Sequence, residues 1–235
     1  MQMKMLVTMA MLCLAGCVSA WQREVRPGDQ DVMLPVAEHG EPLTENAPCS
    51  RYAFLTLPAS GTNSVPLDGV VSAMQGAPLH GEMRCYIKAD ARCRFKEFSD
   101  LLDLCSRSGV CRFSVVARSG TAMQDRGGPQ LLALAFLRPC LRCPEEERFA
   151  DGFRVEIAPS RHDKGNGVVV WCRKSVSLAE LDSELGWLAN NPSVGGGKGV
   201  CLKCCESAPY KTFVNVLEVL YKHGFKRVSV FTLSL

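Results

Sequence analysis

The sequence predicts an α+β protein made of two tandem small domains, each a mixed β-sheet with two α-helices packed on one face. Three observations support this: an internal repeat, an alternation of strand-like and amphipathic helical segments in each copy, and a turn-rich stretch before the first copy. The 235 residues suffice for two small cores. A net charge of +3, from 27 basic and 24 acidic residues, gives no basic stripe, so we expect no nucleic-acid partner.

The N-terminus predicts an exported protein. Residues 1–16 hold one charged side chain, Lys4, and then a short apolar run, as a signal peptide does. That run is shorter than the roughly 20 residues that a membrane-spanning helix needs. The tetrapeptide Leu14–Cys17 looks like a lipobox, which predicts cleavage before Cys17 and acylation of that cysteine as a lipid anchor. Cleavage after Ala20 would instead release a soluble protein, and both outcomes stay open at this point.

Residues 17–50 are polar and rich in proline and glycine, which predicts a flexible tether behind the anchor. A flexible coil of about 30 residues spans on the order of 30 Å. Val18 follows the anchor cysteine in place of the Asp that commonly retains lipoproteins at the inner membrane. We therefore expect a periplasm-facing protein in a Gram-negative-type cell envelope, with the outer membrane preferred.

An internal duplication organises the rest of the chain. Residues 83–117 align without a gap with residues 198–232, at a constant offset of 115. Eight of the 35 aligned pairs are identical, where ordinary composition gives about two. A second block, 64–74, aligns with 175–185 at an offset of 111. The repeat predicts a first domain over 51–140 and a second over 141–235.

Within each copy, the apolar pattern predicts strands and helices in a fixed order. Strand–helix–strand units of this length join parallel strands by right-handed crossovers, so we expect the helices on one face of each sheet. The second copy is predicted to hold strands over 153–157, 167–172, 200–204 and 227–233, and helices over 176–188 and 210–223, the first of them capped by Ser177 and Glu180. The first copy has a strand over 52–57 and the same two helices, but no clear equivalent of the strand 167–172. Residues 131–137 are predicted to be a buried strand between the copies.

The stretch 200–232 resembles the C-terminal signature of the ExbD/TolR family. That signature has a strand ending in Ala-Asp, a Tyr that opens a helix, a Gly that closes it, and a last strand ending near Thr. Copy one supplies Asp90 and Gly109, and copy two supplies Tyr210 and Gly224. The sequence departs from the pattern where Cys204 and Cys205 replace Ala-Asp and where Phe95 replaces the Tyr.

This resemblance implies a non-catalytic component of a proton-motive-force-driven, TonB/Tol-like transport system. Family members carry a membrane Asp for proton flow, whereas the apolar segment 5–20 holds no acidic residue. The implied partners are ExbB-like or TonB-like proteins, peptidoglycan, a second copy of the chain, and the membrane through the lipid anchor. The edges of the predicted sheet suit the addition of a partner strand.

The cysteines support an alternative function, a periplasmic thiol-redox or zinc-binding protein. Cys140 and Cys143 form one CxxC pair, and Cys201 and Cys204, followed by Cys205, form another. If residues 200–204 are a strand, Cys201 and Cys204 point to opposite faces and do not chelate one ion together. Structural disulfides, buried thiols, and metal or redox chemistry all stay open for these cysteines.

No catalytic residue, metal site or cofactor site is predicted beyond these pairs. The four histidines lie far apart and show no HExxH spacing. Trp187, on the helix 176–188, is interpreted either as a core residue or as an anchor for a dimer. The sequence therefore favours a binding protein over an enzyme.

Overall fold

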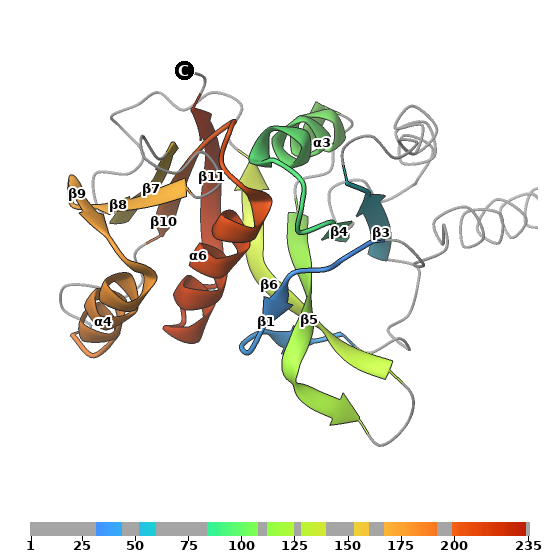
Figure 1. Ribbon diagram of the computed structural model, residues 1–235, viewed down its shortest axis with the longest axis horizontal. Coiled ribbons are helices and arrows are strands. Elements are labelled where there is room, and N and C mark those ends of the chain that lie inside the picture. The colour runs from blue at the N-terminus through green and yellow to red at the C-terminus, as the bar shows by residue number, and fades with distance from the viewer. Residues whose placement is uncertain are drawn as a thin grey trace, which may run out of the picture.

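The computed structural model describes residues 32–43, 52–59, 84–107, 112–124, 128–139, 153–159, 167–191 and 199–233. These residues form a mixed sheet of 11 strands with three helices, which confirms the α+β class (Figure 1). None of the helices in these ranges is long and apolar enough to cross a membrane.

The described part of copy one is a parallel strand–strand–helix–strand unit. Its elements are β3 (Tyr52–Leu57), β4 (Arg84–Ala89), α3 (Phe95–Arg107) and β5 (Arg112–Gln124), and β4 pairs in parallel with both β3 and β5. Helix α3 is amphipathic: its buried side chains, at spacings of three and four, include Phe95, Phe98, Leu102 and Cys105. The strand 52–57 and the crossover through α3 agree with the sequence prediction. The first predicted helix of copy one, residues 64–74, lies outside the described residues.

Copy two has the same unit with an additional hairpin. Its elements are β7 (Phe153–Pro159), β8 (Gly167–Trp171), β9 (Lys174–Val176), α4 (Leu178–Ala189), β10 (Val200–Cys205), α6 (Tyr210–Lys222) and β11 (Arg227–Leu233). Strands β7, β10 and β11 are parallel, while β8 and β9 are antiparallel to their neighbours. Ser177 and Glu180 form the predicted capping box of α4.

The duplication is preserved residue by residue. Helices α3 and α6 begin at residues 95 and 210, and β5 and β11 begin at 112 and 227, so both differences equal 115. The strand register repeats as well. Ile87 lies opposite Val115 in copy one, and Leu202 lies opposite Val230 in copy two. Both copies therefore adopt one backbone plan.

The described parts of the two copies share one sheet, in place of the two sheets that the sequence predicts. Strand β6 (Gly128–Pro139) is antiparallel to β5 and parallel to β11, so it joins the copies in the strand order β3-β4-β5-β6-β11-β10-β7-β8-β9. The buried strand expected over 131–137 is confirmed within β6. The expected domain boundary, at residue 140, lies outside the described residues.

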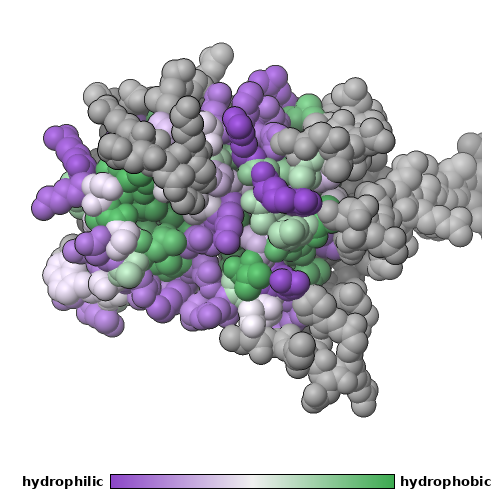
Figure 2. All heavy atoms as spheres, in the orientation of Figure 1, coloured by the Kyte–Doolittle hydropathy of each residue, from purple (hydrophilic) through white to green (hydrophobic). Residues whose placement is uncertain are grey.

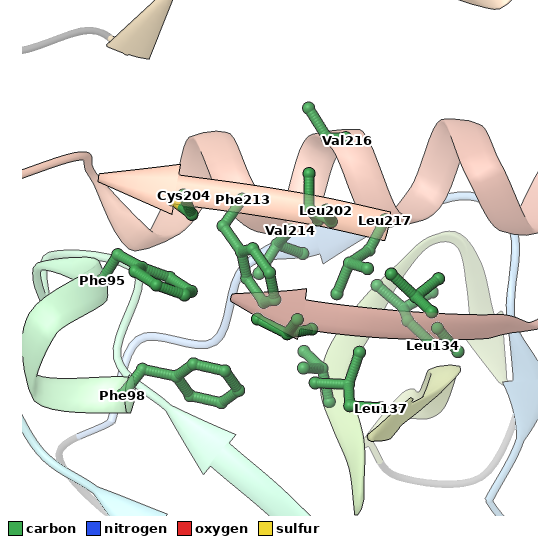
Figure 3. Packing of buried hydrophobic residues seen from close by; sticks show 14 of the residues in the cluster. Phe95, Phe98, Leu134, Leu137, Leu202, Cys204, Phe213, Val214, Val216 and Leu217 are labelled. Atoms are coloured by element: carbon green, nitrogen blue, oxygen red, sulfur yellow. The ribbon is translucent and has the colours of Figure 1, made fainter. Parts of the chain in front are cut away.

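One hydrophobic cluster includes side chains from both copies. All three helices and strands of both copies contribute to it. Figure 3 shows Leu217 of α6 pointing toward Leu134 of β6, with Leu137 beside them. Because these side chains share their neighbours, neither copy buries its apolar face independently of the other.

Part of the predicted tether belongs to the folded protein. Strand β1 (Val36–Ala37) pairs in parallel with β5, and β2 (Glu41–Pro42) pairs antiparallel with β6. Leu34 and Leu43 pack against a second small cluster made of Tyr86, Val116 and Ala133. Gly40 lies in the connection between β1 and β2, Pro35 precedes β1 and Pro42 is part of β2, so this stretch is ordered rather than a free coil. The rest of the predicted tether lies outside the described residues.

Gly224 ends α6 in the left-handed region, with a φ of 84°. An added Cβ would meet no atom within 4 Å there, so only the backbone conformation demands glycine. We expect Gly224→Ala to lower the free energy of unfolding by about 1 kcal/mol. Gly199→Ala is the matched control, because its Cβ would also meet no atom within 4 Å and its φ is not left-handed. Urea denaturation measures both variants, and equal losses would contradict the assignment.

Candidate functional site

Asp90, a family-motif position, joins β3 and the end of β4 in copy one to the segment 32–43. Its side chain is 0% exposed and follows β4 directly. The carboxylate accepts hydrogen bonds from the backbone N–H of Met33 (2.9 Å) and of Arg92 (2.8 Å), and from the Arg92 guanidinium (2.8 Å to each oxygen). The backbone N–H of Asp90 donates to the carbonyl of Leu57 at the end of β3 (2.9 Å).

These contacts hold Asp90 in its charged form. Hydrogen bonds from the Arg92 side chain are the main cause that lowers the pKa of Asp90 to about 2, and the backbone N–H groups of Arg92 and Met33 add to it. Through its bond from the Met33 backbone N–H, the carboxylate acts as an anchor for the segment 32–43. The equivalent position in copy two is Cys205, which has no carboxylate to hold such a segment.

Glu218 of copy two holds the same segment at a second point. Its carboxylate accepts hydrogen bonds from the backbone N–H groups of Glu38 and His39, the latter at 3.3 Å, and lies 3.5 Å from the His39 ring nitrogen Nδ1. The segment 32–43 is therefore bound to copy one through Asp90 and to copy two through Glu218. It lies across the junction between the repeats.

Tyr210, the second family-motif position, belongs to an aromatic cluster at this junction. The cluster consists of Phe95 and Phe98 of α3 and Tyr210 and Phe213 of α6, and we call it the junction cluster. Ring centroids are 4.9 Å apart for Phe95 and Phe213 and 5.0 Å apart for Phe98 and Tyr210, pairs that the offset of 115 interchanges. Figure 3 shows Phe95 and Phe98 pointing from α3 toward Phe213 of α6.

The backbone around the junction cluster follows the same symmetry. The N–H of Phe95 donates to the carbonyl of Ala208 at 2.8 Å, and the N–H of Tyr210 donates to the carbonyl of Cys93 at 3.0 Å. Both the donors and the acceptors differ by 115 residues, so each copy donates to the other in an equivalent bond. The two copies are thus related by an approximate two-fold axis, as the subunits of a symmetric dimer are.

The Tyr210 hydroxyl is fully buried in the junction cluster. It has no hydrogen-bond partner among the described residues, and burial raises its pKa well above the ordinary value. Phe95 occupies the equivalent place in copy one and fills it without a polar atom. Tyr210 therefore acts mainly through its ring, as a packing residue between the copies.

Most of the described cysteines are buried thiols. Within the described ranges Cys85, Cys93, Cys105, Cys201, Cys204 and Cys205 are buried and Cys172 is exposed. Cys204 lies in the main core and Cys201 on the opposite face of β10, as the strand prediction implies. No group of three His, Cys, Asp or Glu side chains converges in this part of the chain. Cys140 and Cys143 lie outside the described residues.

Burial makes these thiols poor nucleophiles. It raises the pKa of Cys93 and of Cys105 to about 12, and the pKa of Cys85 and Cys204 is raised further by the same cause. A thiol with a pKa of about 12 is ionised in roughly one molecule in 10⁴ at pH 8. This arrangement does not favour thiol-redox chemistry at Cys204.

Thiol labelling tests this conclusion. In the native full-length chain at pH 8, we expect iodoacetamide to modify Cys172 while Cys93, Cys105 and Cys204 react only after unfolding. Peptide mapping by mass spectrometry identifies each modified cysteine, and Cys172→Ser is the control that removes the first label. Rapid modification of native Cys204 would show that β10 opens or that its thiol is activated.

The two edge strands of the sheet differ in how well they are protected from pairing with other chains. At one end, β9 is only three residues long and contains Lys174, and Arg173 lies in the two-residue turn before it. Figure 2 shows hydrophilic side chains at this end of the molecule, on the left. Short, charged edge strands resist pairing with other chains, so β9 is a protected edge.

At the other end, β3 has the opposite character. Among the described residues it pairs with β4 alone, and its sequence YAFLTL is six residues long with no charge and no proline. Leu55 is buried in the main core, which fixes the strand in the sheet. A long, uncharged edge is a template for another strand. We therefore take the outer edge of β3 as the candidate binding site.

Sequence reasoning missed the outer edge of β3, because no local sequence pattern determines the order of the strands in a sheet. It also missed Met33 and Glu218. Trp187 is 57% exposed, so its interpretation as a core residue is wrong, and its interpretation as a dimer anchor stays a prediction. Cys17 and Gly109 lie outside the described residues.

Comparison with known proteins identifies no relative: no family model, no curated protein and no solved structure matches the chain. The likeness to the ExbD/TolR family therefore remains a resemblance in the order and spacing of the residues around Asp90, Tyr210 and Gly224.

Proposed function

We propose that this protein is a non-catalytic binding component of the bacterial cell envelope, working with a TonB/Tol-like transport system. Its folded part would bind an extended segment of a partner protein by adding it as a strand to the sheet. The observation that carries this proposal is the uncharged edge of β3, six residues long, at the end of the sheet opposite the protected β9.

The roles of the charged groups support binding rather than catalysis. Asp90 and Glu218 accept hydrogen bonds from the backbone of the segment 32–43. Asp182 of α4 contacts Lys222 at 2.8 Å and His223 at 2.7 Å, which fixes α4 on α6. Carboxylates used in this way stabilise a scaffold, and a rigid scaffold presents an edge strand in a fixed conformation.

The partner class follows from the resemblance to the ExbD/TolR family. ExbB-like and TonB-like proteins and peptidoglycan are its expected partners, with a lipid-anchored Cys17 holding the protein at the membrane. The chain has no acidic residue in its apolar segment 5–20, so in this proposal it contributes recognition and another subunit carries the protons.

Capture from solubilised envelope tests the proposal. The full chain, immobilised through a C-terminal tag, is expected to retain an ExbB-like or TonB-like protein or peptidoglycan fragments, identified by mass spectrometry. The double variant Lys174→Ala, Arg173→Ala changes only the protected edge at β9 and should retain the same partner. Recovery of none of these components by the native chain would overturn the proposal.

A further inference from the structure

The strand register identifies β3 and β7 as equivalent strands of the two copies. Leu55 of β3 lies opposite Ile87 of β4, and Val155 of β7 lies opposite Leu202 of β10. Ile87 and Leu202 are equivalent by the offset of 115. Leu55 and Val155 therefore occupy the same place, and both are buried in the main core.

In copy two the outer edge of this strand is covered. Strand β8 lies antiparallel to β7, with Trp171 opposite Val155 and Val169 opposite Ile157. Val169 and Trp171 are buried and extend the core beyond β7. The edge that β7 presents is therefore complemented by an antiparallel strand whose alternate residues are large and apolar.

Copy one has too few residues to supply its own equivalent of β8. In the aligned sequences, residues 158–174 separate Ile157 from Ser175, and they contain β8. Only residues 58–63 separate Leu57 from Ser64, the corresponding positions of copy one. Six residues cannot form a connection, a five-residue strand and a return.

We infer that the outer edge of β3 binds an extended segment of a partner protein that runs antiparallel to β3, as β8 runs along β7. The residues of that segment opposite Leu55 and Leu57 are β-branched or aromatic, because Trp171 and Val169 occupy the matching places in copy two. This inference rests on the proposed function and specifies the site, the polarity and the side-chain pattern of the partner.

The backbone of β3 is oriented for this contact at Thr56. The carbonyl of Leu57 accepts a hydrogen bond from the N–H of Asp90, so the peptide groups of Leu57 point toward β4. Because successive residues of a strand alternate, the N–H and C=O of Thr56 point away from β4. In copy two the equivalent residue, Glu156, lies opposite Val170 of β8.

A peptide of residues 165–173 with Cys172→Ser is the probe, because it carries β8 with its flanking residues. We expect it to bind the full chain, measured by fluorescence anisotropy, and to slow hydrogen exchange at the Thr56 amide at least about tenfold at saturation. Leu57 is the internal control, because its N–H already points toward β4. A spin label at the C-terminus of the peptide should broaden the amide signals at the start of β3, near Tyr52, since the strands are antiparallel.

Two substitutions test the site. Thr56→Pro removes the outward N–H without a change in the bonds to β4, and it should weaken peptide binding by about tenfold or more. Thr56→Val keeps the N–H and should bind as the native chain does. A probe peptide N-methylated at Val170 lacks the N–H that would donate to the Thr56 carbonyl, because Val170 lies opposite the equivalent Glu156; it should bind at least about tenfold more weakly and serves if the proline variant unfolds.

Several outcomes would overturn the inference. These are absence of peptide binding, broadening near Leu57 instead of Tyr52, or binding that neither Thr56→Pro nor N-methylation of the probe at Val170 weakens. A Thr56 amide protected before peptide is added would show that the chain covers its own edge, and a dimer by light scattering that Thr56→Pro dissociates would make a second copy the occupant. If envelope partners are still captured in any of these cases, the protein remains a binding component of the envelope, but strand addition at β3 is wrong.

Discussion

Phe98→Ala and Phe213→Ala are each expected to lower the free energy of unfolding of the whole chain by about 3–5 kcal/mol. The two side chains are equivalent by the offset of 115, are fully buried, and face each other with ring centroids 5.3 Å apart. Each truncation leaves a cavity inside the junction cluster, which both copies line. The two losses should therefore be similar, and the double variant should lose less than their sum, because the residues are in contact.

Tryptophan fluorescence makes this prediction specific. Of the three tryptophans, Trp171 and Trp187 are in copy two, whereas Phe98 is in copy one. Trp21 precedes both copies, so Trp21→Phe is introduced into the reference chain and into every variant that this experiment compares. If the copies share one core, Phe98→Ala shifts the urea transition that tryptophan reports as much as the transition that circular dichroism reports. Lys96→Ala is the control on the same helix, with a side chain 54% exposed, and should change stability by less than about 0.5 kcal/mol. A tryptophan transition unmoved by Phe98→Ala would mean that the copies unfold as separate domains.

The elements inside each repeat were predictable because local patterns determine them. Ser177 and Glu180 cap α4, Gly224 ends α6, and the runs 52–57 and 227–233 are the strands β3 and β11 with the predicted bounds. Because the repeat contains the same pattern twice, the second copy checks the assignment made in the first. Local propensity and hydrophobic periodicity agree in both copies, and this agreement is what makes an assignment from sequence secure.

The arrangement of the copies was not predictable, because it depends on contacts between residues distant in sequence. Strand β6 joins β5 in a long hairpin and then pairs with β11, almost 100 residues further along. The backbone exchange at Phe95 and Tyr210 likewise needs both copies folded. A sequence repeat indicates two similar units but does not tell whether they pack as separate domains or as one symmetric body.

The segment 32–43 was not predictable for the same reason: its single apolar residues contact residues that are distant in sequence. Leu34 and Leu43 are isolated apolar residues among prolines, glycines and charges, and nothing local distinguishes them from residues of a linker. Their partners, such as Tyr86 and Ala133, lie 43 to 99 residues away. For the candidate site, the sequence marked Asp90 as a motif position, but its partner Met33 was assigned to the tether.

Asp90→Ala is expected to lower the free energy of unfolding by about 2 kcal/mol at pH 7 and to loosen the segment 32–43 at its Met33 end. The pKa of Asp90 is about 2 in the folded protein and has its usual value of 3.8 when the chain is unfolded. A depressed pKa stabilises the folded state above the unfolded value, so the contribution is complete above about pH 5. It is lost as the pH falls through 3.8 toward 2, because the unfolded chain takes up the proton before the folded state does.

The difference in stability between the native chain and Asp90→Ala should therefore shrink between pH 5 and pH 2, as measured by urea denaturation at a series of pH values. Arg92→Ala separates the contribution of the Arg92 side chain from that of the backbone N–H groups that also bond to Asp90. The Arg92 side chain is 56% exposed and its loss leaves the bonds from the backbone N–H groups of Met33 and residue 92, so this variant should lose less stability. Limited proteolysis within 32–43 should accelerate in Asp90→Ala and change little in Arg92→Ala. A stability difference that stays constant down to pH 2 would show that Asp90 contributes through packing, and that its charge does not hold the N-terminal segment.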